Sequence, residues 1–95
     1  MRLSPSTASL IKTSVQSLAP GSELLLFGSR ANDEAKGGDI DLLLLTEKKL
    51  PLMLISRLRR LILRQIGEQK IDIVNFPKSS DHPFKARALE TAVKL

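Results

Sequence analysis

Short apolar runs alternate along the chain with longer stretches in which apolar residues recur every three or four positions. Runs of four or five apolar residues beside glycine or charged residues are typical of buried strands, whereas the longer spacing is typical of amphipathic helices. The apolar runs predict strands over residues 23–27, 39–46 and 70–76.

The stretches with helical spacing predict three helices. The first begins at Ser4-Pro5, because serine caps a helix and proline suits its first position, and it ends before Gly21. The second follows Pro51 and ends near Gly67. The third covers residues 84–93. This order predicts one domain over residues 1–95, of the α/β (α+β) class, in which helices pack on a small mixed β-sheet.

Two carboxylates open the second predicted strand. Asp39 and Asp41 are two residues apart, so both side chains point to one face, about 7 Å apart along the strand. Beside a buried run they repel each other and lose hydration, so each resists ionisation. A bound cation would remove that conflict, and oxygen ligands suit Mg²⁺ or Mn²⁺ better than zinc. The alternative is a pair of solvated carboxylates that accept hydrogen bonds from the loop.

A third carboxylate, Asp72, lies between two isoleucines of the third predicted strand. Aspartate is rare in such a position unless the strand is at an edge or the side chain has a partner. If this strand lies beside the second, Asp72 can meet Asp39 and Asp41 on one surface. The alternative is a solvated carboxylate on an edge strand.

The polar segment of residues 28–38 joins the first two strands. Gly28 allows a phosphate to approach the backbone closely, and Ser29 supplies a hydroxyl and an N–H. Arg30 can add a bidentate contact to a nucleotide phosphate. The alternative is a long connection with a glycine turn, in which Arg30 is a solvated charge.

Together these segments resemble the nucleotidyltransferase superfamily that includes DNA polymerase β, and specifically its minimal nucleotidyltransferases. That family has a strand, Gly-Ser, a loop, Asp-x-Asp before apolar residues, and a third acid on a later strand. Here these are Gly28-Ser29, Asp39-Ile40-Asp41 and Asp72. The resemblance implies a polymerase β-like core in which Gly28 and Ser29 hold the triphosphate. The three aspartates are then the catalytic residues and the ligands of Mg²⁺ or Mn²⁺.

The resemblance also implies a function, the transfer of a nucleoside monophosphate, AMP from ATP, to an acceptor. Because little chain remains outside the core, we expect the acceptor on a second protein. Minimal members resemble antitoxins that pair with a small helical protein of the HEPN type, and some adenylylate a tyrosine of that partner. The alternative from another class is a non-catalytic antitoxin or nucleotide-binding protein that acts by docking. A homo-oligomer also remains open.

The net charge of +5 adds one further candidate surface. Arg57, Arg60 and Arg64 fall on one face of the second predicted helix, which indicates a solvated surface or a docking site for an acidic partner or RNA. A small basic nucleic-acid binder is therefore a third hypothesis. However, the chain has three phenylalanines and neither tyrosine nor tryptophan, so it lacks the aromatic platform on which single strands stack.

The remaining composition excludes several classes of protein. There is no cysteine, which excludes disulfides and zinc–thiolate sites. No apolar signal core follows the N-terminus, and no apolar run approaches the roughly 18–20 residues of a membrane helix. We therefore expect a cytoplasmic protein without a membrane partner.

Overall fold

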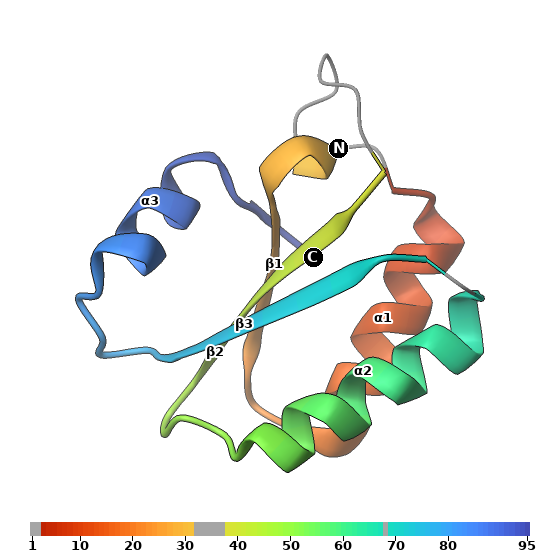
Figure 1. The fold of residues 1–95 in the computed structure, drawn as a ribbon, viewed down its shortest axis with the longest axis horizontal. Coiled ribbons are helices and arrows are strands. Elements are labelled where there is room, and N and C mark those ends of the chain that lie inside the picture. Colours follow the sequence, from red (N-terminus) through yellow and green to blue (C-terminus); the bar gives the residue numbers. More distant parts are fainter. Residues whose placement is uncertain (1–2, 32–37, 68) are drawn as a thin grey trace.

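The computed structural model describes residues 3–31, 38–67 and 69–95 of the chain. Helices and strands follow one another in the order shown in Figure 1. They are α1 (Pro5–Leu18), β1 (Glu23–Phe27), the 3₁₀ turn η1 (Gly28–Ala31), β2 (Ile40–Thr46), α2 (Leu52–Ile66), β3 (Ile71–Pro77), α3 (Pro83–Thr91) and β4 (Val93–Lys94).

The strands form one mixed sheet in the order β3-β2-β1-β4. β1 is antiparallel to both β2 and β4, whereas β2 and β3 are parallel and are joined by α2. The sequence-based prediction of an α/β (α+β) fold with a small mixed sheet is confirmed. The three predicted strands are also confirmed: β1 has the predicted boundaries, and those of β2 and β3 differ by at most one residue.

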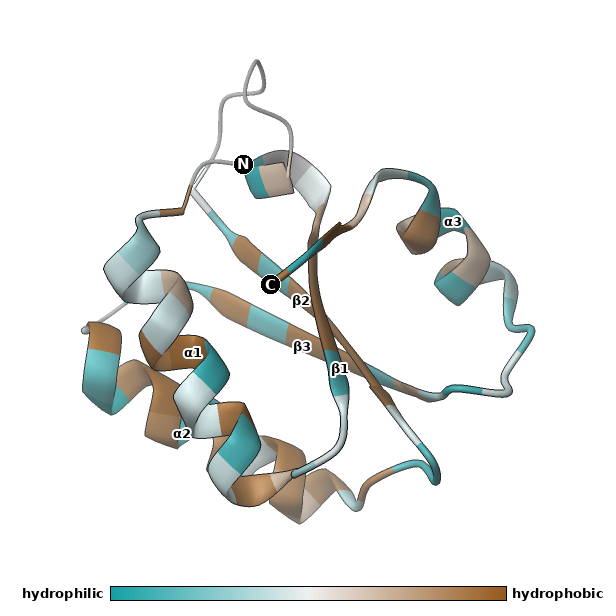
Figure 2. Ribbon diagram, turned by 180° about the vertical axis from the view of Figure 1, so that it is seen from behind, coloured by the Kyte–Doolittle hydropathy of each residue, from teal (hydrophilic) through white to brown (hydrophobic). Residues whose placement is uncertain are grey.

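Each face of the sheet is covered by helices, which explains why β2 is apolar on both sides (Figure 2). α1 and α2 pack on one face, where Leu42 and Leu44 of β2 meet Ile11 and Ile62. On the other face Leu43 and Leu45 pack with Ala88 of α3. The alternation along β2 therefore fixes which of its side chains point toward α3.

The helix ends follow the expected capping chemistry. Ser4 Oγ accepts a hydrogen bond of 3.1 Å from the N–H of Thr7, and Gly67 ends α2 with a positive φ of 86°. The last helix is shorter than expected: it ends at Thr91, and Val93 and Lys94 pair with β1 as β4.

Among the described helices, none is long and apolar enough to cross a membrane.

The two ends of the sheet differ in their polar residues. We call the end formed by the last residue of β1 and the first residues of β2 and β3 the acidic end, because Asp41 and Asp72 lie there. We call the opposite end, where β2 and β3 finish and β1 starts, the tied end. Asn75 is buried at the tied end and bonds three groups: it donates to the Leu44 carbonyl and to Thr46 Oγ1, and its Oδ1 accepts from the Leu50 N–H at 2.7 Å.

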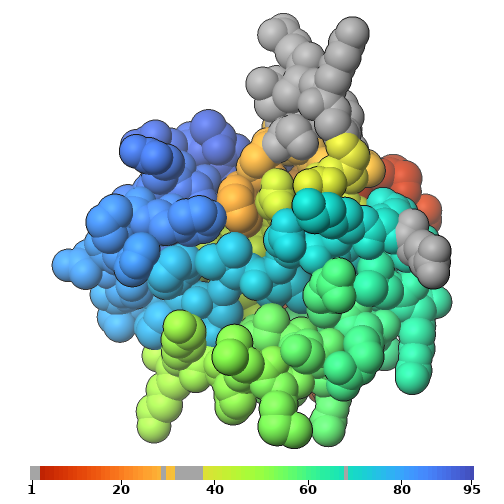
Figure 3. Space-filling view, in the orientation of Figure 1, coloured from red at the N-terminus to blue at the C-terminus, as the bar shows by residue number. Residues whose placement is uncertain are grey.

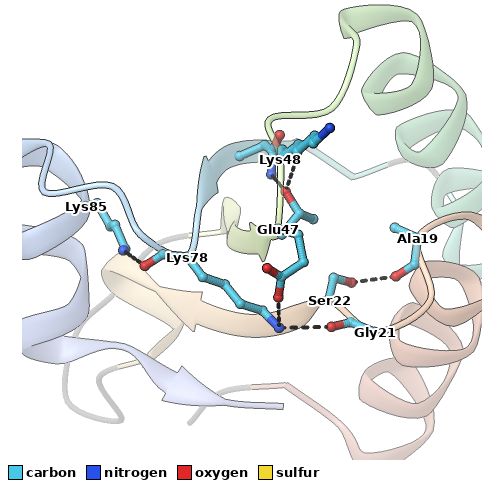
Figure 4. Close-up of polar contacts among 9 residues, drawn as sticks. Ala19, Gly21, Ser22, Glu47, Lys48, Lys78 and Lys85 are labelled. Atoms are coloured by element: carbon cyan, nitrogen blue, oxygen red, sulfur yellow. Dashed lines mark hydrogen bonds and ion pairs between the residues drawn. The ribbon is translucent and has the colours of Figure 1, made fainter.

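Two lysines connect further segments at the tied end (Figure 4). Lys85 of α3 is buried and donates to the carbonyls of Lys78 and Ser80, at 2.6 and 2.7 Å. The Lys78 ammonium donates to the Gly21 carbonyl at 3.2 Å and lies 3.6 Å from the Glu47 carboxylate. These contacts fix the connections after β2 and β3 to the start of β1.

Candidate functional site

The candidate site lies at the acidic end, where three segments far apart in the chain meet. η1, the start of β2 and the start of β3 lie side by side on the surface in Figure 3. Asp41 is paired in register with Phe27 of β1 on one side and with Asp72 of β3 on the other. The sequence analysis required the third strand to lie beside the second for the acids to meet. The structure shows these two strands paired in parallel, which brings Asp41 and Asp72 together.

The strand alternation determines where these two carboxylates point. Asp41 shares a face of β2 with Leu43 and Leu45, which pack toward α3, and in-register neighbours on adjacent strands share a face. Adjacent strands are about 4.8 Å apart, so Asp72 lies beside Asp41 on that face. Asp41 is half-buried, whereas Asp72 is exposed on the edge strand.

Gly28 places its backbone directly against Asp41. Its φ is +72°, in the left-handed region that favours glycine, and a Cβ at this position would collide with Asp41 Oδ2. Two separate requirements, the backbone conformation and the close approach of a carboxylate, therefore select glycine here. The Gly28 backbone lies against this carboxylate at the acidic end, and the approach of a phosphate to it stays a prediction.

The electrostatics of the site are those of crowded like charges. Burial raises the pKa of the Asp41 carboxyl above its ordinary value of 3.8, and the negative charges of Asp72 and Asp39 raise this pKa further. Lys70 acts in the opposite direction. The like-charge conflict expected from the sequence is therefore found at Asp41.

Asp39 lies just before β2 and has a partner that the sequence analysis missed. Its Oδ2 is 3.5 Å from Lys70 Nζ, and the neighbouring N–H of Ile40 donates to the Lys70 carbonyl at 2.9 Å. Within residues 3–31, 38–67 and 69–95, no three acidic or histidine side chains come close enough to hold a metal ion together. Lys70 is the first residue of the predicted third strand and immediately precedes the observed β3, and its charge beside Ile71-Asp72 was the signal that could have indicated this ion pair.

The other predicted nucleotide-binding residues lie in η1. The Arg30 guanidinium donates from Nη2 to the Gly38 carbonyl at 2.9 Å, which joins the two ends of the polar segment next to Asp39. The side chain of Ser29 and residues 32–37 lie outside what the structure describes. The phosphate contacts of Ser29 and Arg30 remain predictions.

An aromatic cluster beside the acids was also missed. Phe84 of α3 packs edge-on against Phe27, with ring centroids 5.9 Å apart, and lies nearly parallel to Phe76 at 6.1 Å. Phe27 is the in-register neighbour of Asp41, so this cluster borders the carboxylates on the side of α3. Its members are spread over three segments, and only the fold shows that they meet.

The residues at the acidic end suit a divalent cation. Their side-chain donors are carboxylate oxygens, which hard ions such as Mg²⁺ and Mn²⁺ prefer, and a cation would relieve the repulsion that raises the pKa of Asp41. Asp41 and Asp72 are in-register neighbours on one face of the sheet, whereas the Asp39 carboxylate is paired with Lys70.

Comparison with known proteins agrees with this geometry. A search of curated proteins found no match. In contrast, the family model described as a nucleotidyltransferase domain matches residues 8–95, which include both strands that carry the acids and the Gly-Ser turn. A match over nearly the whole chain identifies the fold as a nucleotidyltransferase core, and the chain belongs to the nucleotidyltransferase domain family.

Proposed function

We propose that this chain transfers a nucleoside monophosphate, AMP from ATP, to an acceptor on a partner protein, with Mg²⁺ or Mn²⁺ as cofactor. The family supports nucleotidyl transfer in general. The observation that carries the proposal is the in-register pairing of Asp41 with Asp72 beside the Gly28 backbone. These groups bring carboxylate oxygens that a cation can bind next to the backbone of the Gly-Ser turn.

Each residue has a proposed task in the reaction. Gly28 and Ser29 hold the triphosphate through backbone N–H groups and the serine hydroxyl, and Arg30 contacts a phosphate. Asp39, Asp41 and Asp72 hold the divalent ions. When bound, these ions supply charge neutralisation for the triphosphate and for the pyrophosphate that leaves. Asp72 accepts the proton of the attacking hydroxyl in this proposal, and its exposure leaves it accessible to an acceptor.

We further propose that the acceptor belongs to a small helical partner of the HEPN type and that the pair is a toxin–antitoxin system. One feature supports an acceptor on a second protein: Asp72 is exposed on the edge strand β3, where a second protein can reach it. In this proposal the chain is the antitoxin, and modification of the partner silences it.

The test is label transfer in the presence of a HEPN-type partner. With α-labelled ATP and Mg²⁺ the label should appear on the partner, whereas γ-labelled ATP should leave none, because pyrophosphate departs. Asp39→Asn or Asp41→Asn should reduce transfer by about 10³-fold, since several kcal/mol of charge stabilisation are lost. Asp81→Asn, which changes an exposed acid in the connection before α3, is the matched control and should transfer normally.

The alternative outcomes separate the hypotheses. Full activity of Asp41→Asn would refute the metal assignment. Tight binding to the partner without label transfer would instead support a non-catalytic antitoxin that acts by docking.

A further inference from the structure

The outer face of α2 carries exposed apolar and basic side chains that have no role in the proposed reaction. Leu52 and Met53 are 80% and 82% exposed, although both are large apolar side chains. Met53 lies on the same helical face as Arg57, Arg60 and Arg64, because spacings of three and four residues share a face. We call these residues, together with Leu52, the α2 outer face.

This face is free of acidic residues. The segment 48–67 contains no aspartate or glutamate, while its basic residues are Lys48, Lys49, Arg57, Arg59, Arg60 and Arg64. Arg59 has a structural task, since its Nε donates to the Ile71 carbonyl at 2.9 Å. In the described part of the chain, the side chains of Arg57, Arg60 and Arg64 form no ion pair, and none donates a hydrogen bond to a backbone carbonyl as Arg59 does. Their charge is therefore available to a ligand.

The surface is also hollowed on both sides of the arginines. One hollow of about 370 Å³ is lined by Leu18, Leu61 and the three arginines of the α2 outer face. A second, of about 330 Å³, is lined by Leu52, Met53, Ser56, Arg57 and Arg60. Arg57 and Arg60 line both, so each hollow combines aliphatic walls with guanidinium groups. Side chains of α2 and of the turn before it project from this side of the molecule in Figure 3.

We propose that the α2 outer face is a docking surface for an acidic segment of a second protein that also presents aliphatic side chains. Charge complementarity selects an acidic partner. The two exposed aliphatic residues favour a protein over a nucleic acid, because phosphate contacts require cations and make no use of Leu52 or Met53. Because α2 covers the sheet face opposite α3, this surface is separate from the carboxylates, and the inference does not depend on the transfer reaction.

The test uses a display library of random peptides as the probe. Selection is made on the full chain, with counter-selection on the Arg57→Glu/Arg60→Glu variant. Recovered sequences should be enriched in both acidic and aliphatic residues. Binding of one labelled peptide, followed by fluorescence anisotropy, should weaken at least about tenfold in Arg57→Glu/Arg60→Glu and should fall with rising salt. In Leu52→Ser/Met53→Ser it should weaken about fivefold.

Arg87→Glu/Leu89→Ser is the matched control. It makes the same kind of change on exposed residues of α3 and should bind like the wild type. Circular dichroism of each variant establishes that it is folded. The proposal is overturned if no acidic peptides are recovered or if peptide binding is insensitive to the α2 variants. It is equally overturned if only RNA or anionic phosphatidylserine vesicles bind through the arginines.

Discussion

The tied end and the acidic end of the same sheet place polar groups in opposite ways. At the tied end, Asn75 and Lys85 are buried and each bonds several partners. At the acidic end, Asp41 lies beside a second carboxylate, and its pKa is raised by burial and by like charge. The tied end stabilises the fold, whereas the acidic end keeps an electrostatic conflict that Lys70 opposes and that a bound cation would relieve further. Variants at the two ends should therefore affect different properties.

The largest effect is expected for Asp72→Asn, which should reduce transfer much more than it reduces nucleotide binding. If Asp72 accepts the proton of the attacking hydroxyl, transfer should fall by roughly 10²-fold, the scale of a lost general base. Binding of Mg²⁺ with a non-hydrolysable ATP analogue should remain nearly normal in calorimetry, because Gly28, Asp39 and Asp41 are unchanged. If binding collapses together with transfer, Asp72 is a ligand of the nucleotide site and not the base. If neither changes, Asp72 is a solvated edge carboxylate.

Asn75→Ala tests the tied end and should lower stability without a change in the chemistry. It leaves the Leu50 N–H and the Leu44 carbonyl without their side-chain partner, and unsatisfied buried groups cost about 1–3 kcal/mol each. We expect a loss of about 2–3 kcal/mol in urea unfolding. Gln65→Ala, an exposed polar residue of α2, should change stability little. A stable Asn75→Ala protein would mean that this network does not hold the tied end.

Two glycines allow a direct comparison of the ends. Gly21 and Gly28 have positive φ values of +81° and +72°, but a Cβ at Gly21 meets nothing within 4 Å, whereas one at Gly28 collides with Asp41. Alanine at either site should cost about 1–2 kcal/mol for the left-handed backbone. Only Gly28→Ala should also weaken metal binding, because the Asp41 carboxylate must move. Coupling between Gly28→Ala and Asp41→Ala in a double-mutant cycle measures this contact, and additivity would rule it out.

The smallest effect concerns the stability of the metal-free protein. Because the folded-state pKa of Asp41 lies above 3.8, the folded state binds this proton more tightly than the unfolded state. The resulting stabilisation is present below the unfolded pKa and is lost as pH rises through the folded pKa. Asp41→Asn should therefore unfold at a slightly higher Tm than the wild type at neutral pH, by at most about 3 °C. A lower Tm would show that the carboxylate stabilises the fold.

Much of the fold could be predicted because its determinants are local. The apolar runs identify the strands, and Ser4-Pro5, Pro51 and Gly67 mark helix ends. The alternation along β2 also places Asp41 on the face toward α3. β4 was missed, because Val93 and Lys94 become a strand through the open edge of β1 and not through their own preference.

The site was less predictable than the fold for a related reason. Side chains in separate segments can be assigned to a face from sequence, but their contacts depend on the packing of those segments. The Lys70–Asp39 ion pair and the packing of Phe84 on Phe27 are of this kind. The collision that would follow a Cβ at Gly28 is a third example, since it involves the end of one strand and the start of another.

Because the acidic end forms only when β2 and β3 are paired, a ligand that binds there should stabilise the folded chain and slow its proteolysis. Asp41 and Asp72 are neighbours only while these strands are paired, so a ligand of the acidic end binds the folded state alone. By mass action, such a ligand at a concentration of 100 times its Kd adds about 2.7 kcal/mol to stability. Proteases that cleave opened chains would then remove the unliganded protein first. The supply of ligand would in this way set how much of the protein persists.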